Sequence, residues 1–167
     1  MKSGIEVTVD RVGALVRDLR ALSTQDVLVG VPEAETQREP EPGEPAGITN
    51  AAIGYINEFG SPVNNIPARP HLFPGIEDAR DRLTPELGGA FAAALDGRMD
   101  DVDTRLNRAG LIAQAAVRSR IITGPFVPLA PSTIAARKRR GHEGEAPLQE
   151  SGQYRQAITY VLRRRSK

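Results

Sequence analysis

The 167-residue chain contains no cysteine and no tryptophan, and aromatic residues make up only 4% of it. The missing cysteines exclude disulfides, thiolate zinc sites and a cysteine nucleophile. The hydrophobic core must therefore be built mainly from alanine, valine, leucine and isoleucine, with the four phenylalanines as its few large side chains. A chain of this length can form one domain with a real core, and it is too short for two comfortable ones.

Long apolar runs and an excess of one charge are also missing. No stretch approaches the roughly 20 apolar residues that a membrane span needs. The first residues alternate in polarity and so do not look like the apolar centre of a signal peptide. The formal net charge of +1 excludes a strong overall attraction to nucleic acid or to acidic membranes. We therefore expect a soluble protein, made in the cytoplasm, with no membrane partner.

The sequence contains no recognisable catalytic, metal or cofactor motif. Its two histidines, His71 and His142, lie outside any cluster with the spacing of metal ligands, although the loop His142–Glu145 could bind a divalent ion weakly. A phosphate-binding loop and a serine nucleophile motif are both lacking. A metal-dependent hydrolase built on Glu58 and His71 is a weak rival. We predict that the protein is not an enzyme and needs no metal or cofactor.

Hydrophobic periodicity predicts a chain that mixes strands with helices. Two early strands and a closing one are expected to form a small, mostly antiparallel sheet, covered by long helices. The expected strands are Ile5–Val9, Asp26–Val31 and Ala157–Leu162. The expected helices are Arg11–Ser23, Thr49 or Asn50 to Phe59, Pro74–Ala94 with a kink or break at Pro85, Asp100–Thr123, and Ser132–Arg139 capped by Ser132, with a turn at Gln153–Arg155.

This order predicts an α+β fold, a small mostly antiparallel sheet packed against several helices, with long protruding loops. The whole chain, residues 1–167, is interpreted as a single domain. Three irregular segments stand out within it: an acidic, proline-rich loop at about 32–47, a basic loop at about 123–150 and a basic tail at 163–167. The acidic segment has too little apolar content to offset the entropy of ordering it, so we interpret it as a protruding loop.

The most informative stretch is a predicted helix end followed by a proline-rich segment. Gly60 suits the left-handed position after a helix, and Pro67 and Pro70 restrict both themselves and the residues before them. Residues 66–70 should therefore form a rigid extended strap. Glu58 is expected to pair with Arg69 through two parallel hydrogen bonds, in preference to acting as a general base. The residues of this structural motif are Glu58, Phe59, Gly60, Ile66, Pro67, Arg69 and Pro70.

Two oppositely charged segments are candidates for contacts between subunits. The acidic candidates are Glu33, Glu35, Glu39, Glu41 and Glu44, and the basic candidates are Arg137, Lys138, Arg139 and Arg140. On neighbouring copies of a ring the two segments could attract each other. Two alternatives stay open: both segments are simply solvated, or the basic run, with the arginines at 163–165, neutralises the phosphates of nucleic acid.

Four segments in a fixed order resemble the tail-completion and head–tail joining proteins of tailed bacteriophages. The first resembles the family's V-x-V-G strand, the second its N/H-E-F-G element and I-P-x-R-P strap, and the others its P-L-x-P-x-T-x-x-x-K segment and its P-L-x-x-T/S-G ending. In this chain the segments are Asp26–Pro32, Ile53–Phe73, Ile121–Lys138 and Pro147–Tyr160, so the resemblance spans about Val27 to Val161. Asn57 and His71 depart from it, because many relatives have histidine and phenylalanine at these positions.

The resemblance implies a structural protein of the virion. Such proteins complete the tail, or join it to the head connector, as closed rings that commonly hold six copies. The partners implied are other copies of the chain and neighbouring neck or tail proteins such as the tail tube, connector or stopper, with DNA passing through the ring without sequence recognition. The location implied is the neck or the head-proximal tail, and the host cytoplasm during assembly. The alternative function is a nucleic-acid-binding module that uses Arg137–Arg140 and the basic tail.

Overall fold

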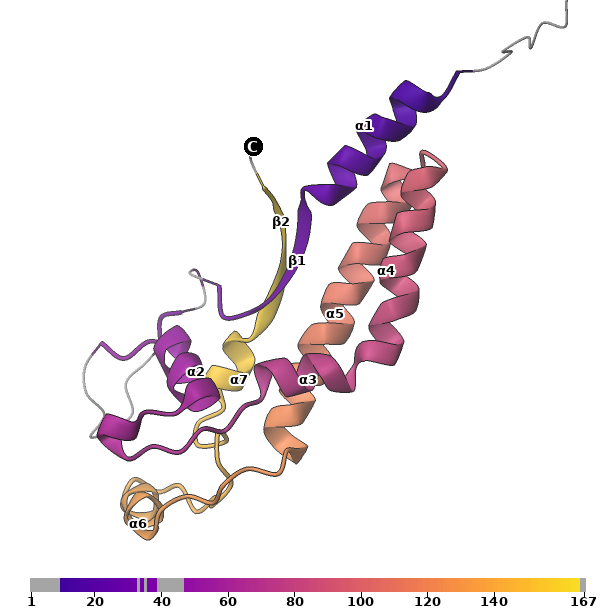
Figure 1. The fold of residues 1–167 in the computed structure, drawn as a ribbon. Helices are drawn as coiled ribbons and strands as arrows, with labels where there is room; N and C mark the ends of the chain where they lie inside the picture. Colours follow the sequence, from indigo (N-terminus) through magenta and orange to yellow (C-terminus); the bar gives the residue numbers. More distant parts are fainter. Residues whose placement is uncertain (1–9, 33, 35, 39–46, 166–167) are drawn as a thin grey trace, which may run out of the picture.

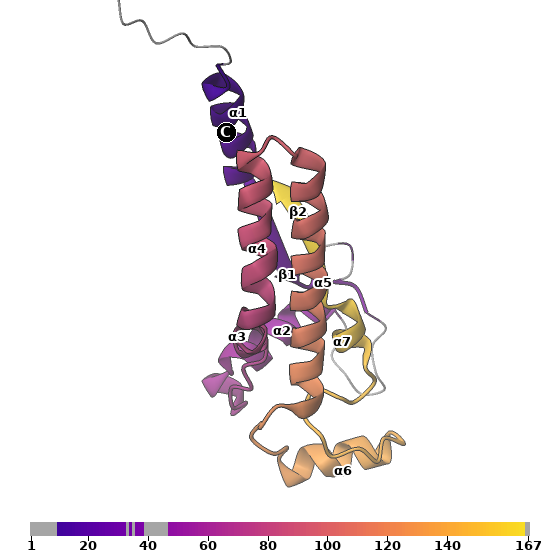
Figure 2. The ribbon, with the colours of Figure 1, turned by 90° about the vertical axis from the view of Figure 1, so that its right-hand side faces the viewer.

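A hairpin of two long helices, α4 (Arg80–Leu95) and α5 (Met99–Thr123), forms the centre of the fold (Figures 1 and 2). The computed structural model describes residues 10–32, 34, 36–38 and 47–165. Within these ranges the fold is α+β, as the sequence predicts, with several helices around a small antiparallel sheet. The expected strand Ile5–Val9 lies outside the described residues. None of the described helices is long and apolar enough to cross a membrane.

The face of α5 that packs into the core follows a helical spacing in the sequence. Its buried residues include Val102, Leu106, Ala109, Ala113, Ala116 and Val117. Small side chains on the facing helix α4, at Ala90, Ala93 and Ala94, complete this part of the core. The predominance of alanine lets the two helices approach closely, which agrees with a core that has few large side chains.

The sheet consists of β1 (Gln25–Gly30) and β2 (Thr159–Arg164), which pair antiparallel from Gln25 opposite Arg164 to Gly30 opposite Thr159. Val27 packs against the core cluster of α4 and α5, and Val29 packs against a second cluster formed with Ile121 and Ile158. The two strands therefore lie against α5 and bring the second and the last predicted strands together, as expected.

The remaining helices occupy the two ends of the molecule. Figures 1 and 2 show α1 (Val12–Ser23) extending beyond the end of the sheet, while α2 (Asn50–Phe59), α7 (Gln153–Ala157) and α6 (Pro131–Arg139) lie at the opposite end. The short helices η2 (Pro62–Asn64) and α3 (Leu72–Asp78) belong to the segment that links α2 to α4. Helix α2 packs against α7 and α3 packs against α5.

Three local predictions need correction. The helical break falls at Ala79, between α3 and α4, and Pro85 lies inside α4. Helix α3 crosses α5 closely while α4 runs along it, so the direction changes before Pro85. Ser132 does not cap α6, because Pro131 starts the helix and Ala130 is the cap residue; proline is well suited to the first helical position, where its missing N–H is not needed. The expected turn at Gln153–Arg155 is the first part of α7.

Gly75 allows the close crossing of α3 and α5. A Cβ atom at Gly75 would lie 2.8 Å from the backbone Cα of Val117, whereas a Cβ at Gly88 in α4 would meet nothing within 4 Å. A clash with helical backbone cannot be relieved by moving a side chain, so one helix must shift.

We expect Gly75→Ala to lower the free energy of unfolding by about 1–3 kcal/mol through this overpacking. The matched control Gly88→Ala should raise it by about 0.5–1 kcal/mol, because alanine loses less backbone entropy than glycine in a helix. Denaturant unfolding of both variants measures the difference. Equal effects of the two substitutions would contradict the close crossing.

Candidate functional site

The buried face of α2 is small and polar, which the sequence analysis missed. It consists of Asn50, Gly54 and Glu58, whereas Phe59, expected among the few large side chains of the core, is 58% exposed. A Cβ at Gly54 would lie only 2.8 Å from the hydroxyl oxygen of Tyr154, so the glycine makes room for that ring. These positions are four residues apart, which is a helical spacing. Hydropathy still cannot identify this buried face, because its residues are not hydrophobic.

The two ends of α2 agree with the sequence prediction. The Thr49 hydroxyl accepts a hydrogen bond from the N–H of Ala52 at 3.1 Å and caps the first turn. Gly60 ends the helix with a φ of 78°, in the left-handed region. A Cβ at Gly60 would also lie 2.9 Å from the backbone nitrogen of Ala68 in the strap. Glycine is therefore required at this position both for its φ and for the close passage of the strap.

The strap, residues 66–70, runs back along the end of α2, without helix and with backbone hydrogen bonds at both ends. Ser61 and Ile66 exchange N–H to carbonyl bonds of 2.8 and 3.0 Å, and the N–H of Arg69 donates to the carbonyl of Asn57 at 2.6 Å. The absence of helix in residues 66–70 agrees with the predicted strap.

Glu58 caps the start of α3 instead of pairing with Arg69, so the predicted Glu58–Arg69 pair is wrong. Its Oε2 accepts the backbone N–H groups of His71 at 2.8 Å and Leu72 at 2.9 Å, and its Oε1 accepts that of Phe73 at 3.2 Å. Helix starts leave N–H groups without partners, and a carboxylate there is favoured by the helix dipole. Since Glu58 is only 4% exposed, this one side chain satisfies three donors where water cannot.

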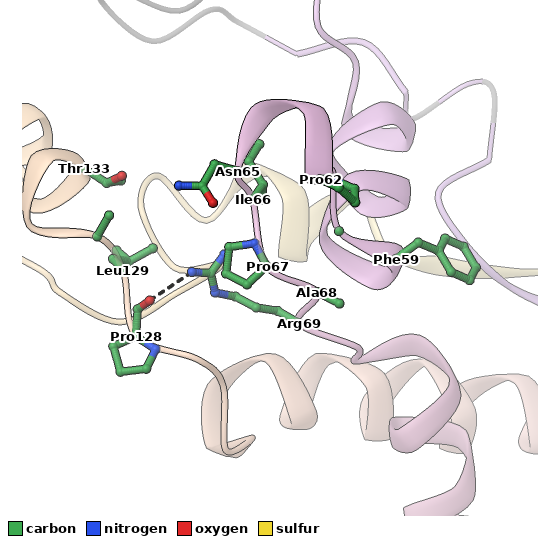
Figure 3. A pocket seen from close by; sticks show the side chains of 12 residues that line it. Phe59, Pro62, Asn65, Ile66, Pro67, Ala68, Arg69, Pro128, Leu129 and Thr133 are labelled. Carbon is green, nitrogen blue, oxygen red and sulfur yellow. Dashed lines mark hydrogen bonds between the residues drawn. The ribbon is translucent and has the colours of Figure 1, made fainter.

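Arg69 points in the other direction and binds the segment after α5. Its Nε donates to the carbonyl of Val127 at 2.8 Å, and one of its terminal nitrogens donates to the carbonyl of Pro128 at 3.0 Å (Figure 3). Burial lowers the pKa of Arg69, and the nearby charge of Arg137 lowers it further. The planar guanidinium thus fixes the strap to a loop almost sixty residues away in sequence.

His71 and Tyr154 complete a buried hydrogen-bonded chain. The ring Nδ1 of His71 lies 2.9 Å from the carbonyl of Arg69, so Nδ1 carries the proton and Nε2 accepts the hydroxyl of Tyr154 at 2.5 Å. Burial lowers the pKa of His71, although the Arg69 carbonyl and Glu58 oppose the shift. Burial, and to a lesser extent Glu58, raises the pKa of Tyr154. Both rings are therefore neutral and hold α7 to the strap.

The cluster of Glu58, His71 and Tyr154 contains groups that enzymes use, but its geometry suits a structural role. His71 has no exposed surface, and the carboxylate of Glu58 is occupied by three backbone donors. A general base must reach a substrate proton within hydrogen-bonding distance. Neither side chain offers such access in this conformation. Within the part of the chain that the structure covers, no group of three or more potential ligands could hold a metal ion.

An open groove of about 700 Å³ lies between the strap and the segment that precedes α6 (Figure 3). Gly60, Ile66 and Pro67 form one side of it, and Pro128, Leu129 and Thr133 form the other. Arg69 also lines the groove, with its guanidinium directed toward Pro128. Because both sides are fixed through Arg69, the groove is a rigid surface feature of mixed polarity.

The basic run at residues 137–140 is mostly engaged within the chain. Arg137 is buried and donates to Glu150 and to the carbonyls of Gly144 and Ala146, and Arg140 also binds Glu150. Arg137 is therefore not a surface cation, contrary to its selection as an interface candidate. Lys138 pairs with Glu145, with both side chains more than half exposed. Surface pairs of this kind contribute little, so Lys138 and the exposed Arg139 remain candidates.

The acidic candidates Glu33, Glu35, Glu39, Glu41 and Glu44 all lie outside the described residues. In the basic tail, Arg163 and Arg165 both bind Asp26 on β1, and these interactions lower the pKa of Asp26. Arg164 lies 3.8 Å from Asp103. These cations remain largely exposed, but each has an acidic neighbour at the end of the sheet. Docking between the acidic and basic segments stays a prediction.

The chain matches no protein-family model, no curated protein and no solved structure. The internal arrangement of the site is therefore the direct guide to function. Glu58, Arg69 and His71 belong to one sequence segment, and Pro128 and Tyr154 belong to two others. Hydrogen bonds from Arg69 to the carbonyl of Pro128 and between His71 and Tyr154 join the three segments.

We expect Glu58→Gln to lower the free energy of unfolding by roughly 2–4 kcal/mol. The substitution removes the charge and places an amide donor against backbone donors, leaving buried N–H groups unsatisfied. The matched control is Glu77→Gln, on the exposed side of α3, where the glutamate only pairs with Arg80. That change should alter stability by less than about 0.5 kcal/mol. Urea unfolding checks both values, and similar small effects at the two positions would refute the capping role.

Proposed function

We propose that the protein is a structural part of the neck or head-proximal tail end of a tailed bacteriophage, where identical copies form a ring. The observation that carries this proposal is the meeting of the resemblance segments at one buried anchor. Glu58 and Arg69 come from the second segment, Pro128 from the third and Tyr154 from the fourth. Motif segments that contact one another support a shared architecture more strongly than the motifs do separately.

The anchor also explains what the motif residues would do in a ring. It holds the end of α2 and the start of the segment that follows, and this region carries apolar groups on its outer surface. Tyr55 and Phe59 are both largely exposed with their ring centres 4.9 Å apart, and Val63 at the tip of η2 is 96% exposed. Apolar groups gathered on a rigid exposed surface are typical of protein contacts. They suit binding to a neighbouring subunit or to another virion protein.

A ring of this kind is built from head-to-tail contacts, in which one surface of a copy meets a different surface of the next. We infer six copies, by the resemblance, around an opening through which DNA passes without being read. The neighbours would be the tail tube and the connector or stopper proteins, and assembly would take place in the host cytoplasm before the protein enters the virion. The proposal assigns the protein no enzymatic activity, metal or cofactor.

The alternative, a nucleic-acid-binding module, receives less support from the arrangement of the basic residues. Arg137 and Arg140 are both bound to Glu150, so only Lys138 and Arg139 of the run face solvent freely enough to meet phosphates. Nucleic-acid binding through many phosphate contacts would make affinity fall steeply with salt.

The test is the mass of the purified full chain, measured by native mass spectrometry and sedimentation, with negative-stain images alone and after mixing with isolated tail tubes. We expect closed rings of one size, either in solution or at the ends of the tubes. A chain that stays monomeric in every condition would contradict the proposal.

Duplex DNA binding, measured over a range of salt concentrations, distinguishes the alternative. If the protein stays monomeric and binds DNA strongly, with an affinity that falls steeply as salt is added, the nucleic-acid-binding module is the better account of its function.

A further inference from the structure

The outer edge of β1 presents backbone groups that no other strand of the described residues pairs with. The N–H of Arg165 donates to the carbonyl of Thr24, so in this antiparallel ladder Thr24 and every second residue after it point toward β2. Gln25, Val27 and Val29 therefore direct their N–H and C=O groups outward. Outside the sheet, these groups form no backbone hydrogen bond with other described residues. The edge can accept one more strand.

An apolar trough lies beside this edge. A groove of about 690 Å³ is lined by Val27, Leu28 and Val29 of β1 and by residues of α3, α4 and α5, including Phe73 and Leu87. It adjoins a second groove, of about 640 Å³, which shares Val27, Leu28 and Leu87. Phe73 is 71% exposed and Leu87 is 47% exposed. An added strand would cover these side chains as well as pair its backbone.

The edge lacks the features that usually prevent strand addition. Edge strands are commonly protected by lysine, proline or a bulge, but β1 has none of these and its register with β2 is regular. In contrast, β2 ends in consecutive arginines. The apolar trough is lined by β1 and not by β2. The combination of open backbone and apolar side chains favours β1 as the acceptor.

The sequence before Asp10 has the pattern of the missing strand. Ile5, Val7 and Val9 alternate with Glu6 and Thr8, which gives one apolar side and one polar side. This segment precedes the residues that the structure describes, and it is connected to α1. The apolar side matches the trough in character, and the alternation matches the requirements of a strand.

The same copy cannot place this segment on its own β1. Figures 1 and 2 show α1 continuing away from the end of the sheet, and its twelve residues span about 18 Å. Val9 lies three residues before Val12, so an extended chain carries it back by at most about 11 Å, and it carries Ile5 back by at most about 25 Å. At most the first two residues of the segment could therefore pass the end of α1, so the segment as a whole could not pair along β1. A neighbouring copy has no such constraint.

We propose that Ile5–Val9 of one copy adds as a third strand to the free edge of β1 in the next copy. Main-chain hydrogen bonds to Gln25, Val27 and Val29 would supply affinity, and the trough would bury Ile5, Val7 and Val9. The contact joins different surfaces of two copies, as a closed ring requires. Only the closure into a ring rests on the proposed function; the strand addition stands independently.

Site-specific disulfide trapping tests the contact cleanly because the native chain has no cysteine. Donor variants carry one cysteine each, as Glu6→Cys, Val7→Cys, Thr8→Cys or Val9→Cys, and a mass-tagged acceptor carries Leu28→Cys. Adjacent strands lie about 4.8 Å apart with alternating side chains, so at least one donor must bring its Cα within the 4.4–6.8 Å that a disulfide needs. The matched control acceptor is Val63→Cys, on the exposed η2.

We expect mixed, oxidised samples to give linked dimers with Leu28→Cys for one or two alternating donors, at least about tenfold more than with Val63→Cys. Absence of linkage for all four donors, or equal linkage to the control, would overturn the proposal. A chain with both cysteines that links only to itself would also overturn it. If rings form but no disulfide-linked dimers appear, the strand addition is wrong and the proposed function is unaffected. If linked dimers appear but no rings form, the strand addition is supported and the proposed ring is wrong.

Discussion

Three backbone N–H groups at the start of α3 share one acceptor, the buried carboxylate of Glu58. The position of the strap depends on this contact, because it fixes where the chain must leave the strap and turn into α3. The cost of burying a charge is offset by three charge-assisted hydrogen bonds and by the positive end of a helix. A side chain that could have been a general base is thereby used as a cap between two helices.

The other connections of the site extend from that point. Arg69 hydrogen-bonds the strap to the loop after α5, and His71 links the end of the strap to α7 through its hydrogen bond with Tyr154. Each of these polar groups is buried and each has partners, which is the condition under which a polar network rigidifies a structure. The result is a set of loops with fixed roots, set at one end of a helical hairpin, while the open edge of β1 lies along the hairpin itself. The proposed ring uses both regions for contacts.

The sequence predicted regular elements better than it predicted polar contacts. The buried face of α5, the cap at Thr49, the stop at Gly60 and the extended strap all follow from spacing or from the restricted backbone of glycine and proline. These are local properties.

The partner of Glu58 is not local: opposite charge suggested Arg69, but the backbone of α3 competes for the same carboxylate, and the carbonyls of Val127 and Pro128 compete for the guanidinium. Phe59 was misplaced because the buried face of α2 is polar, and Arg137 because hydropathy cannot reveal an internal pair with Glu150. Only tertiary structure decides between such partners.

The most direct test of the central claim is residue-resolved amide hydrogen exchange in the native full chain. If Glu58 holds the N–H groups of His71, Leu72 and Phe73, these amides should exchange only when the whole protein unfolds, as slowly as the buried amide of Ala113 in α5. Exchange of the three amides at a rate close to that of the exposed Val63 amide would show that the carboxylate does not hold them, and the account built on this anchor would be wrong.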